Sequence, residues 1–280
     1  MVMKLSKSQL AGALATLKKK TPQSLPMCGV IQAELIVGWD WYDFIVDKWP
    51  DLTCIAATPQ EWLVKHKANN GGDVWMNIFS CSSDASTAAF IEQCGIKFKN
   101  ALFFSAIQDN VLRCLRKMSS SLGSIRTSPC HIFGIDGSAN MIKDVNFDGL
   151  MFDELRQSDV DYVNSTWTFG GSKQTKELIS NYVEVFPSSC IRDKENNSIY
   201  AHMMVTRDLS MGMLHVAESK RRLGYGSIVI NNLAAKVKAI GGMPFWFVVE
   251  DNLASLALSE RNGKKLCDDI FSWARFEPNK

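Results

Sequence analysis

One short stretch, residues 215–229, constrains the chain most, because it joins a strand pattern to a helix pattern through a basic, glycine-containing turn. The apolar run 211–217 predicts a strand, and the apolar spacing over 228–240 predicts a helix. Between them lie Lys220, Arg221, Arg222, Gly224 and Gly226. A helix N-terminus offers unpaired backbone N–H groups and the positive end of the helix dipole, and glycine lets a ligand approach the backbone. The stretch therefore predicts an anion site, of which pyrophosphate is a typical occupant.

The spacing of this turn matches neither of two common phosphate-binding motifs. Arg221-x-x-Gly224-x-Gly226 is not the Gly-x-Gly-x-x-Gly of dinucleotide folds, and a P-loop requires Gly-Lys followed by Ser or Thr. Taken alone, these six residues also suit an ordinary strand–loop–helix corner with a solvated basic face. The flanking chain has to decide between the two interpretations.

Composition narrows the class of protein. A chain of 280 residues suits one large or two ordinary domains. The net charge of +2 does not indicate a nucleic-acid binder, and no apolar run approaches the roughly 18 residues of a membrane span. The eight cysteines and four histidines are scattered without metal-ligand spacing, so we expect free thiols in a reducing compartment and no metal site.

The first 33 residues contain five lysines and no acid, a bias found in mitochondrial targeting segments. The leucines at 5, 10, 14 and 17 have helical spacing and favour a folded amphipathic helix instead, and no secretory signal is apparent. We therefore expect an intracellular protein, either mitochondrial or cytoplasmic.

The N-terminal part predicts alternating helices and strands. Helices are expected over 5–20, 41–49, 84–94 and 105–118, and strands over 28–37, 52–57, 73–81 and 131–135. A loop is expected at 69–72, a turn-rich segment at 119–130 and a turn at Gly137-Ser138. A domain boundary is placed near residue 148.

The C-terminal part predicts a different order of strands and helices. Strands are expected over 152–155, 188–193, 198–206, 211–217, 244–250 and 266–276, with helices from 158, over 175–186, 226–240 and 252–261. The order β-α-α-β-β-β-α-β-α-β predicts an α+β domain built around a mixed sheet.

That order, with the basic glycine turn after its fourth strand, resembles the GNAT superfamily of acyl-CoA-dependent N-acyltransferases. A second superfamily motif is recognisable in Asn252-x-x-Ser255-x-x-Leu258, closed by Arg261-Asn262-Gly263. The glycine N-acyltransferase family is a closer match, because several of its segments recur at corresponding order and spacing. They are Val46–Asp51, Pro59–Glu61, Val163-Asn164, Trp167–Gly171 and Phe186-Pro187. The resemblance covers nearly the whole chain.

This resemblance implies a mixed-sheet GNAT-like fold with two tandem acyltransferase-like halves. Residues 1–148 would form a degenerate N-terminal half, and residues 149–280 the catalytic half. It also implies that coenzyme A is held along strand 211–217 and by the turn that follows, with the backbone N–H near Leu214 polarising the thioester carbonyl. The residues assigned to CoA binding are Leu214, Val216, Arg221, Arg222, Leu223, Gly224, Tyr225, Gly226, Ser227, Asn252 and Ser255. Asn252 and Ser255 equally suit a helix cap.

The proton-transfer residues are not fixed by the resemblance. The superfamily's acid is often a tyrosine, but the matching position here is Ser259. The family's proposed base is a glutamate just before the fourth strand; Ser210 occupies that position, and Asp208 is the nearest carboxylate. His202 and His215 lie on adjacent strands, and a free imidazole has a pKa near 6.5. Asp208, Ser210 and His215 are the candidates retained, with Glu218 and Glu250 as further possibilities.

We therefore expect an N-acyltransferase that moves an acyl group from acyl-CoA to glycine or a related small amino acid. The amine would attack the thioester directly in a ternary complex, without a covalent enzyme intermediate. The substrates would be small molecules, with no nucleic acid and no membrane span. Two alternatives stay open: a catalytically silent acyl-CoA-binding protein, and an N-acetyltransferase acting on another amine.

Overall fold

The computed structural model describes residues 1–70, 74–135 and 148–279, which gather into two compact units. Unit 1 comprises Met1–Ile132, Val249–Asp251 and Cys267–Lys280, and unit 2 comprises Phe133–Val248 and Asn252–Leu266. The predicted boundary near residue 148 adjoins a segment outside the described residues and stays a prediction. The predicted turn at Gly137-Ser138 also lies outside them.

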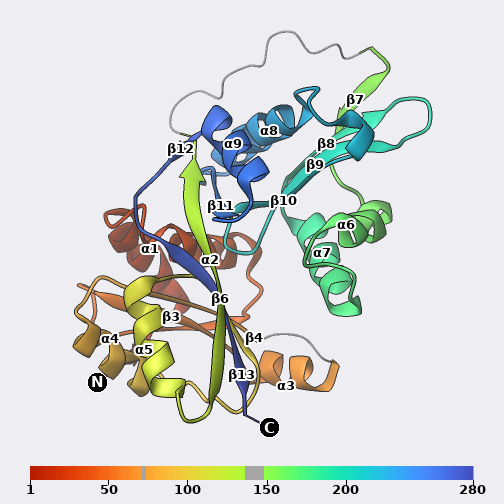
Figure 1. Cartoon of the computed structure of the whole chain (residues 1–280). Helices are drawn as coiled ribbons and strands as arrows, with labels where there is room; N and C mark the ends of the chain where they lie inside the picture. The colour runs from red at the N-terminus through yellow and green to blue at the C-terminus, as the bar shows by residue number, and fades with distance from the viewer. Residues whose placement is uncertain (71–73, 136–147, 280) are drawn as a thin grey trace. The chain divides into compact units, whose positions relative to one another are not determined.

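Unit 1 is a mixed sheet with helices. Its helices are α1 (Leu10–Lys18), α2 (Leu25–Val37), α3 (Glu61–Asn70), α4 (Asp84–Gln93) and α5 (Asp109–Ser119). Its strands are β1 (Met3–Lys4), β2 (Tyr42–Val46), β3 (Cys54–Pro59), β4 (Val74–Ser80), β5 (Leu102–Gln108), β6 (Gly123–Gly134) and β13 (Phe271–Pro278). Within the described residues they follow the order β1-β2-β3-β4-β5-β13-β6, in which β4 and β5 are parallel and the other adjacent strands are antiparallel. The last strand of the chain is thus an interior strand of this sheet (Figure 1).

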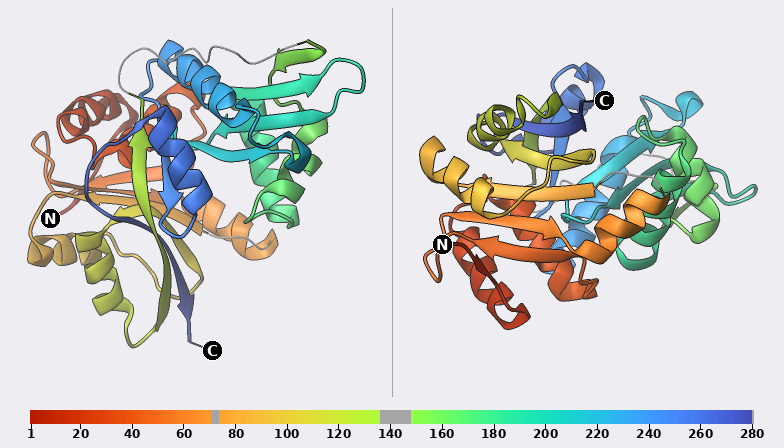
Figure 2. Two further views of the ribbon diagram at one scale, coloured as in Figure 1. Left: turned by 45° about the horizontal axis from the view of Figure 1, so that its top comes forward. Right: turned by 90° about the horizontal axis from the view of Figure 1, so that it is seen from below.

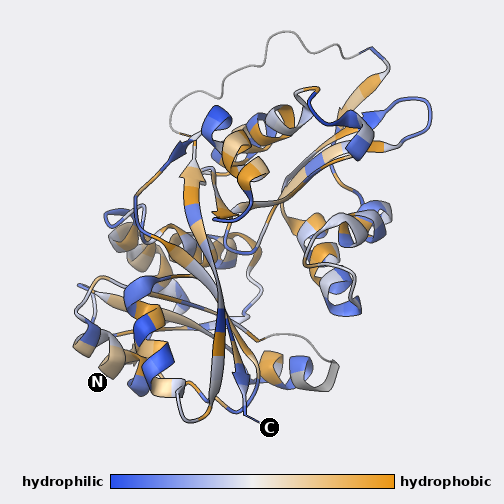
Figure 3. Ribbon diagram, viewed as in Figure 1, coloured by the Kyte–Doolittle hydropathy of each residue, from blue (hydrophilic) through white to orange (hydrophobic). Residues whose placement is uncertain are grey.

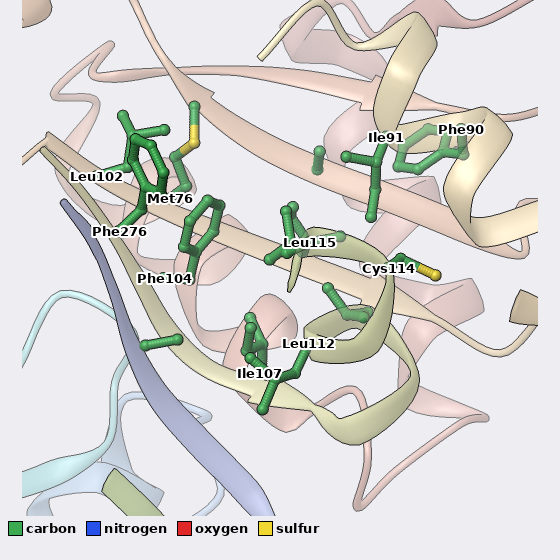
Figure 4. Close-up of a cluster of buried hydrophobic side chains, with 14 of the residues drawn as sticks. Met76, Phe90, Ile91, Leu102, Phe104, Ile107, Leu112, Cys114, Leu115 and Phe276 are labelled. Atoms are coloured by element: carbon green, nitrogen blue, oxygen red, sulfur yellow. The ribbon is translucent and has the colours of Figure 1, made fainter. Parts of the chain in front are cut away.

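Apolar side chains from β4, β5, β13 and α5 form the main core of unit 1. Figure 4 shows Phe276 of β13 beside Leu102 and Phe104 of β5. Helix α5 contributes Leu112 and Leu115 to the same core, and blue and orange segments alternate along its ribbon in Figure 3. Burying one face of an amphipathic helix against a sheet is the main source of stability for a helix this short.

Unit 2 is built on an antiparallel sheet of four strands. These are β7 (Leu150–Asp153), β8 (Ser188–Asp193), β9 (Ile199–Val205) and β10 (Met211–Val216), in the order β10-β9-β8-β7. The other elements are α6 (Val160–Thr166), α7 (Lys173–Val185), α8 (Tyr225–Ala239), β11 (Phe245–Val249), α9 (Leu253–Asn262) and β12 (Lys264–Lys265). Helix α8 covers one face of the sheet, and α6 and α7 lie on the other (Figures 1 and 2).

The predicted α+β class and mixed sheet are confirmed, and the strands and helices expected after residue 150 are present. The last strand, expected over 266–276, begins only at Phe271 and lies in the sheet of unit 1. Two N-terminal predictions were wrong in type. Residues 28–37 belong to helix α2, in which nine of 13 residues are buried, so the sequence lacks the polar face that reveals a helix. Residues 41–49 contain strand β2, whose buried and half-buried residues alternate as a strand requires.

Other N-terminal predictions were wrong about where an element begins or ends. The helix predicted over 105–118 begins only at Asp109, because strand β5 runs directly into α5 without a loop residue. Helix α3 reaches Asn70, where a loop was expected. The turn-rich segment 119–130 is largely strand β6, whose first residues are polar because alternate side chains are exposed.

Candidate functional site

The turn between β10 and α8 presents an uncapped helix N-terminus. A short 3-10 turn, Glu218–Lys220, leads into Arg222 with φ 64° and Gly224 with φ 84°. Gly224 is the N-cap of α8 and has no side chain to accept from the first N–H groups. Glycine adopts this left-handed conformation without the steric cost that other residues incur. The free N–H groups of the first turn are therefore left for an external acceptor, where the helix dipole favours an anion.

Gly226 allows close packing at the start of α8. A Cβ atom at this position would lie 3.2 Å from Leu258 Cδ2 and 3.5 Å from Val216 Cγ2. The first contact is tighter than ordinary side-chain packing, so with a larger residue either the Leu258 side chain or the first turn of α8 would have to shift. The two glycines thus have different roles: Gly224 sets the backbone conformation, and Gly226 sets the helix position.

Basic side chains surround this N-terminus. The Nε atom of Arg221 donates to Val216 O at 3.3 Å, and Lys220 Nζ lies 4.1 Å from the centre of the Tyr200 ring. Arg221 and Arg222 are both exposed. These side chains come directly before the N-terminus of α8 in the chain, so their positive charges add to that of the helix dipole.

A polar network fixes the first turn of α8 to the end of α9. Ser227 Oγ accepts from Asn262 Nδ2 at 2.9 Å, and Asn231 Nδ2 donates to Ser227 O at 2.9 Å and to Asn262 Oδ1 at 3.2 Å. The sequence indicated Ser227 but not Asn231 or a role for Asn262, because their meeting depends on how the two helices pack. The Ser227 hydroxyl holds the helix in place, while its backbone N–H belongs to the first turn.

Strand β10 is bulged and lies at the edge of its sheet. Gly212 pairs with Met204 and His215 pairs with His202, so Met213 and Leu214 together oppose Met203 alone. Met213 has φ 54°, which marks the bulge. Within the described residues, β11 is not a strand of this four-stranded sheet. Bulges interrupt the ladder and redirect backbone groups, and Leu214 is one of the two residues in this bulge.

Two histidines meet across β9 and β10 on the face covered by α6. The ring centres of His202 and His215 are 5.7 Å apart, with planes inclined by 28°. Tyr162 of α6 contacts both rings edge-on, at 5.9 Å from His202 and 6.0 Å from His215. Tyr162 gave no signal in the sequence, because its place beside the histidines depends on the packing of α6.

Both imidazoles are held neutral. Burial lowers the pKa of His202 to about 3, with a further decrease from His215. Burial and then the charge of Arg221 lower the pKa of His215 below its ordinary value. An uncharged imidazole retains a lone pair that can accept a proton.

The other two proton-transfer candidates, Asp208 and Ser210, share the turn between β9 and β10. Asp208 Oδ1 accepts from Ser210 Oγ at 2.6 Å and from Thr206 Oγ1 at 2.7 Å. Asp208 is 1% exposed and Ser210 is 4% exposed. These contacts close the turn, whereas His215 is half-buried beyond the bulge. The structure therefore brings Asp208 and Ser210 together in one turn, whereas His215 lies on β10 beyond the bulge.

The residues indicated on α9 act within the fold. Asn252 Oδ1 accepts from the backbone N–H of Ser255 at 3.1 Å and so caps the helix. Ser259 is buried, and its Oγ accepts from Trp246 Nε1 at 2.7 Å. Of the two remaining glutamates, Glu218 has an exposed side chain, and Glu250 in unit 1 lies 3.6 Å from His131 Nε2.

The corresponding turn of unit 1 differs from this arrangement. Helix α4 follows β4, but its N-cap Ser83 accepts from the Ser86 N–H through its own side chain. The first helical residue is Asp84, which pairs with Arg113. A side-chain cap and a carboxylate satisfy this N-terminus from within, so the anion-binding features belong to unit 2.

The fold and this turn define the class. Tandem α+β halves, one around a mixed sheet and one around an antiparallel sheet, with a basic glycine turn between a bulged strand and a helix, are those of a GNAT-type N-acyltransferase. A family model described as aralkyl acyl-CoA:amino acid N-acyltransferase matches residues 1–187, and one described as FR47-like protein matches residues 189–270. The chain belongs to the aralkyl acyl-CoA:amino acid N-acyltransferase family, whose substrates are an acyl-CoA and an amine.

Named relatives agree with this assignment, and solved structures share the fold. The chain is 23% identical to the glycine N-acyltransferase-like protein Keg1 of Rattus norvegicus, over 70% of this chain and 72% of that protein. It is 22% identical to glycine N-acyltransferase of Mus musculus, over 76% and 78% of the two chains. A Drosophila protein structure superposes with a TM-score of 0.79 at 16% identity, covering 100% of this chain and 99% of the other. A tandem GNAT protein from the clavulanic acid pathway gives 0.56 at 11% identity, covering 100% and 99%.

Within the described residues, the helices are too short or too polar to cross a membrane. The compartment stays a prediction.

Proposed function

We propose that this chain transfers an acyl group from a CoA thioester to the amine of glycine or a related small amino acid. The observation that carries the proposal is the uncapped N-terminus of α8, which directly follows the bulged edge strand β10. An extended pantetheine arm has its diphosphate at one end and its thioester at the other. A strand edge that ends in an anion-binding turn suits both ends of such a ligand.

The backbone N–H groups from Arg222 to Ser227 would bind the pyrophosphate, with Arg221 and Arg222 adding charge. The pantetheine would lie along β10 past Val216, and the N–H of Leu214 would donate to the thioester oxygen. A fixed donor at the position where negative charge develops stabilises the tetrahedral intermediate. Asn252 and Ser255 would contribute by holding the start of α9, whose Leu258 packs beside Gly226.

The amine would attack the thioester carbon in a ternary complex. Holding both substrates in one geometry removes much of the entropic cost of a two-substrate reaction. The choice of glycine is supported by the similarity to glycine N-acyltransferase of Mus musculus. The proposal does not specify the acyl group, which a panel of acyl-CoA substrates would identify.

Thiol release from a panel of acyl-CoAs, measured with and without glycine and other amino acids, tests this function. We expect release that depends on both substrates, with the amide identified by mass spectrometry. Thermal stabilisation by CoA without release in any combination would instead indicate an acyl-CoA-binding protein without activity.

Single charge reversals locate the CoA site in the same preparation. Arg222→Glu should weaken CoA binding at least about tenfold, because a repulsive charge then faces the diphosphate. Lys194→Glu is a matched control, since Lys194 is exposed in the β8–β9 turn of the same unit. Equal CoA affinities for the two variants would contradict this placement.

A further inference from the structure

The register of unit 2 brings three side chains into a row across its sheet. Cys190 of β8 pairs with His202 of β9, and His202 pairs with His215 of β10. Tyr162 of α6 covers the two histidines edge-on. The row ends at His215, the one member on the edge strand, one residue beyond the bulge at Leu214.

His202 has an unusual environment for a histidine. It is 1% exposed, and neither ring nitrogen has a hydrogen-bond partner within the described part of the chain. A buried polar group without a partner costs free energy, and a buried unpaired cation would cost far more. His202 is therefore a neutral, rigid surface against which the His215 ring stacks.

The groups that face this pair disfavour a positive charge on His215. Arg221, from the turn before α8, acts on it directly. The charges of Asp159 and Arg192 oppose each other at His202, because Asp159 raises its pKa and Arg192 lowers it. Tyr162 and Cys190 are uncharged at neutral pH, because burial raises the pKa of both, that of Cys190 to about 12. His215 thus lies beside uncharged, partly buried side chains, and the charge that acts on it is that of Arg221.

We propose that His215 is the proton acceptor of the transferase reaction, and that His202 and Tyr162 are positioning residues that hold its ring in place through the contacts between the rings. This inference rests on the proposed function and assigns the base that the reaction requires. Of the three candidates, only His215 both adjoins the bulge and is partly open to a substrate. Asp208 and Ser210 hydrogen-bond to each other in a closed turn.

The proton balance is complete without another reactant. The acceptor arrives as an ammonium ion and gives one proton to His215. The free amine attacks the thioester carbon, the C–N bond forms and the C–S bond breaks. The second amine proton passes to the departing CoA thiolate, which leaves as the thiol. His215 then releases its proton to water, so one proton is produced per amide formed.

Replacing His215 tests the acceptor. His215→Gln should lower kcat about 100-fold, the lower end of the range for a lost general base. The variant should keep the wild-type affinity for CoA, because its backbone still follows the bulge. Asp208→Asn is the comparison, and it should not reproduce the loss of kcat.

The pH profile tests the positioning residues. In the wild type, the acid limb of kcat at saturating acceptor should lie below pH 6.5, since the pKa of His215 is lowered. Tyr162→Ala and His202→Ala admit water beside His215, so the limb should move to higher pH. Tyr162→Phe and His202→Phe keep an uncharged ring in place and should retain the wild-type limb. Thermal unfolding and CoA affinity show which variants are folded.

The possible outcomes are distinct. A wild-type protein without transfer to any acceptor would overturn the proposed function and this inference with it. An active wild type whose His215→Gln variant keeps kcat and the acid limb would overturn the inference alone. If the alanine and phenylalanine variants at a position have the same acid limb of kcat, the residue at that position has no positioning role. Because two positions are varied, the misfolding of one variant leaves the other pair to decide.

Discussion

Trp246 donates a hydrogen bond from Nε1 to Ser259 Oγ at 2.7 Å, and both side chains are buried. The superfamily resemblance aligns Ser259 with a tyrosine that often protonates the leaving thiolate. The serine instead satisfies the indole of β11 from within α9, so its contact is structural. A thiol has an ordinary pKa near 8.5, and the CoA thiolate therefore needs less help to leave than an alkoxide does.

We expect Ser259→Ala to destabilise the protein by about 1–3 kcal/mol, the cost of leaving a buried N–H group without an acceptor. The kcat of transfer should not change, because the hydroxyl does not face the reacting atoms. Urea unfolding and thiol-release kinetics measure the two quantities. Ser219→Ala, at an exposed serine in the turn before α8, is the control for stability. A large fall in kcat at unchanged stability would restore an acid role to Ser259.

Arg192 forms a buried ionic cluster in unit 2 with Asp153 and Asp159. Arg192 is fully buried; its Nε atom lies 2.8 Å from Asp153 Oδ2, and its other nitrogens bond to Asp159. Asp159→Asn leaves the guanidinium partly unpaired and should cost about 3 kcal/mol of unfolding free energy. Asp161→Asn should cost less than about 1 kcal/mol, because the pair of Asp161 with Lys176 is exposed. Equal losses for the two variants would contradict this ranking.

The same cluster predicts a pH dependence of stability. Burial alone would raise the pKa of Asp153, but hydrogen bonds from the Glu154 backbone and from Arg192 outweigh it and lower the pKa. A lowered folded-state pKa stabilises the protein above the ordinary carboxyl value of about 4, and this stability is lost as the pH falls through the folded value. The stability difference between wild type and Asp153→Asn should therefore shrink below pH 4. A difference that is constant with pH would exclude this linkage.

The C-terminal half was predictable because its elements are separated by clear stop signals. Pro187 ends one helix pattern, Gly224 begins the next, and Gly241 follows it. In the N-terminal half, α2 is buried on most sides and β5 passes directly into α5, so neither leaves a local signal. The interior place of β13 in unit 1 depends on pairing between residues far apart in sequence.

The site divides in the same way. The glycine turn was visible because its backbone requirements are local, as the positive φ of Gly224 illustrates. The bulge at Met213 could not be predicted, because methionine rarely adopts a positive φ and the neighbouring residues do not indicate one. The pairing of His202 with His215 depends on the strand register, and the contact with Tyr162 depends on the packing of α6.

Strand β13 supplies buried side chains to the core of unit 1. Phe271, Ala274 and Phe276 are all 0% exposed, and β13 pairs with both β5 and β6. Phe276→Ala should cost about 3–5 kcal/mol, the usual loss for a buried phenylalanine. Arg275→Ala, on the same strand with an exposed side chain, should cost less than about 1 kcal/mol. A chain that ends after residue 266 keeps all of unit 2 but lacks β13, so the amides of β4 and β5 in unit 1 should lose their protection from hydrogen exchange. Protection of those amides in the shorter chain would show that unit 1 does not need its interior strand.

The fit between Gly226 and Leu258 offers a test of the CoA turn by compensation. Gly226→Ala places a methyl group 3.2 Å from Leu258 Cδ2, so either the leucine shifts or the first turn of α8 moves. Overpacking of this kind costs about 1–3 kcal/mol, and we expect weaker CoA binding because the N–H groups of the turn are displaced. Leu258→Ala opens the space, so the double variant should bind CoA more tightly than Gly226→Ala alone. CoA titration of the wild type, both single variants and the double variant measures this coupling. If the effects of the two substitutions simply add, the turn is not positioned by this contact, since residues that do not interact give additive free energies.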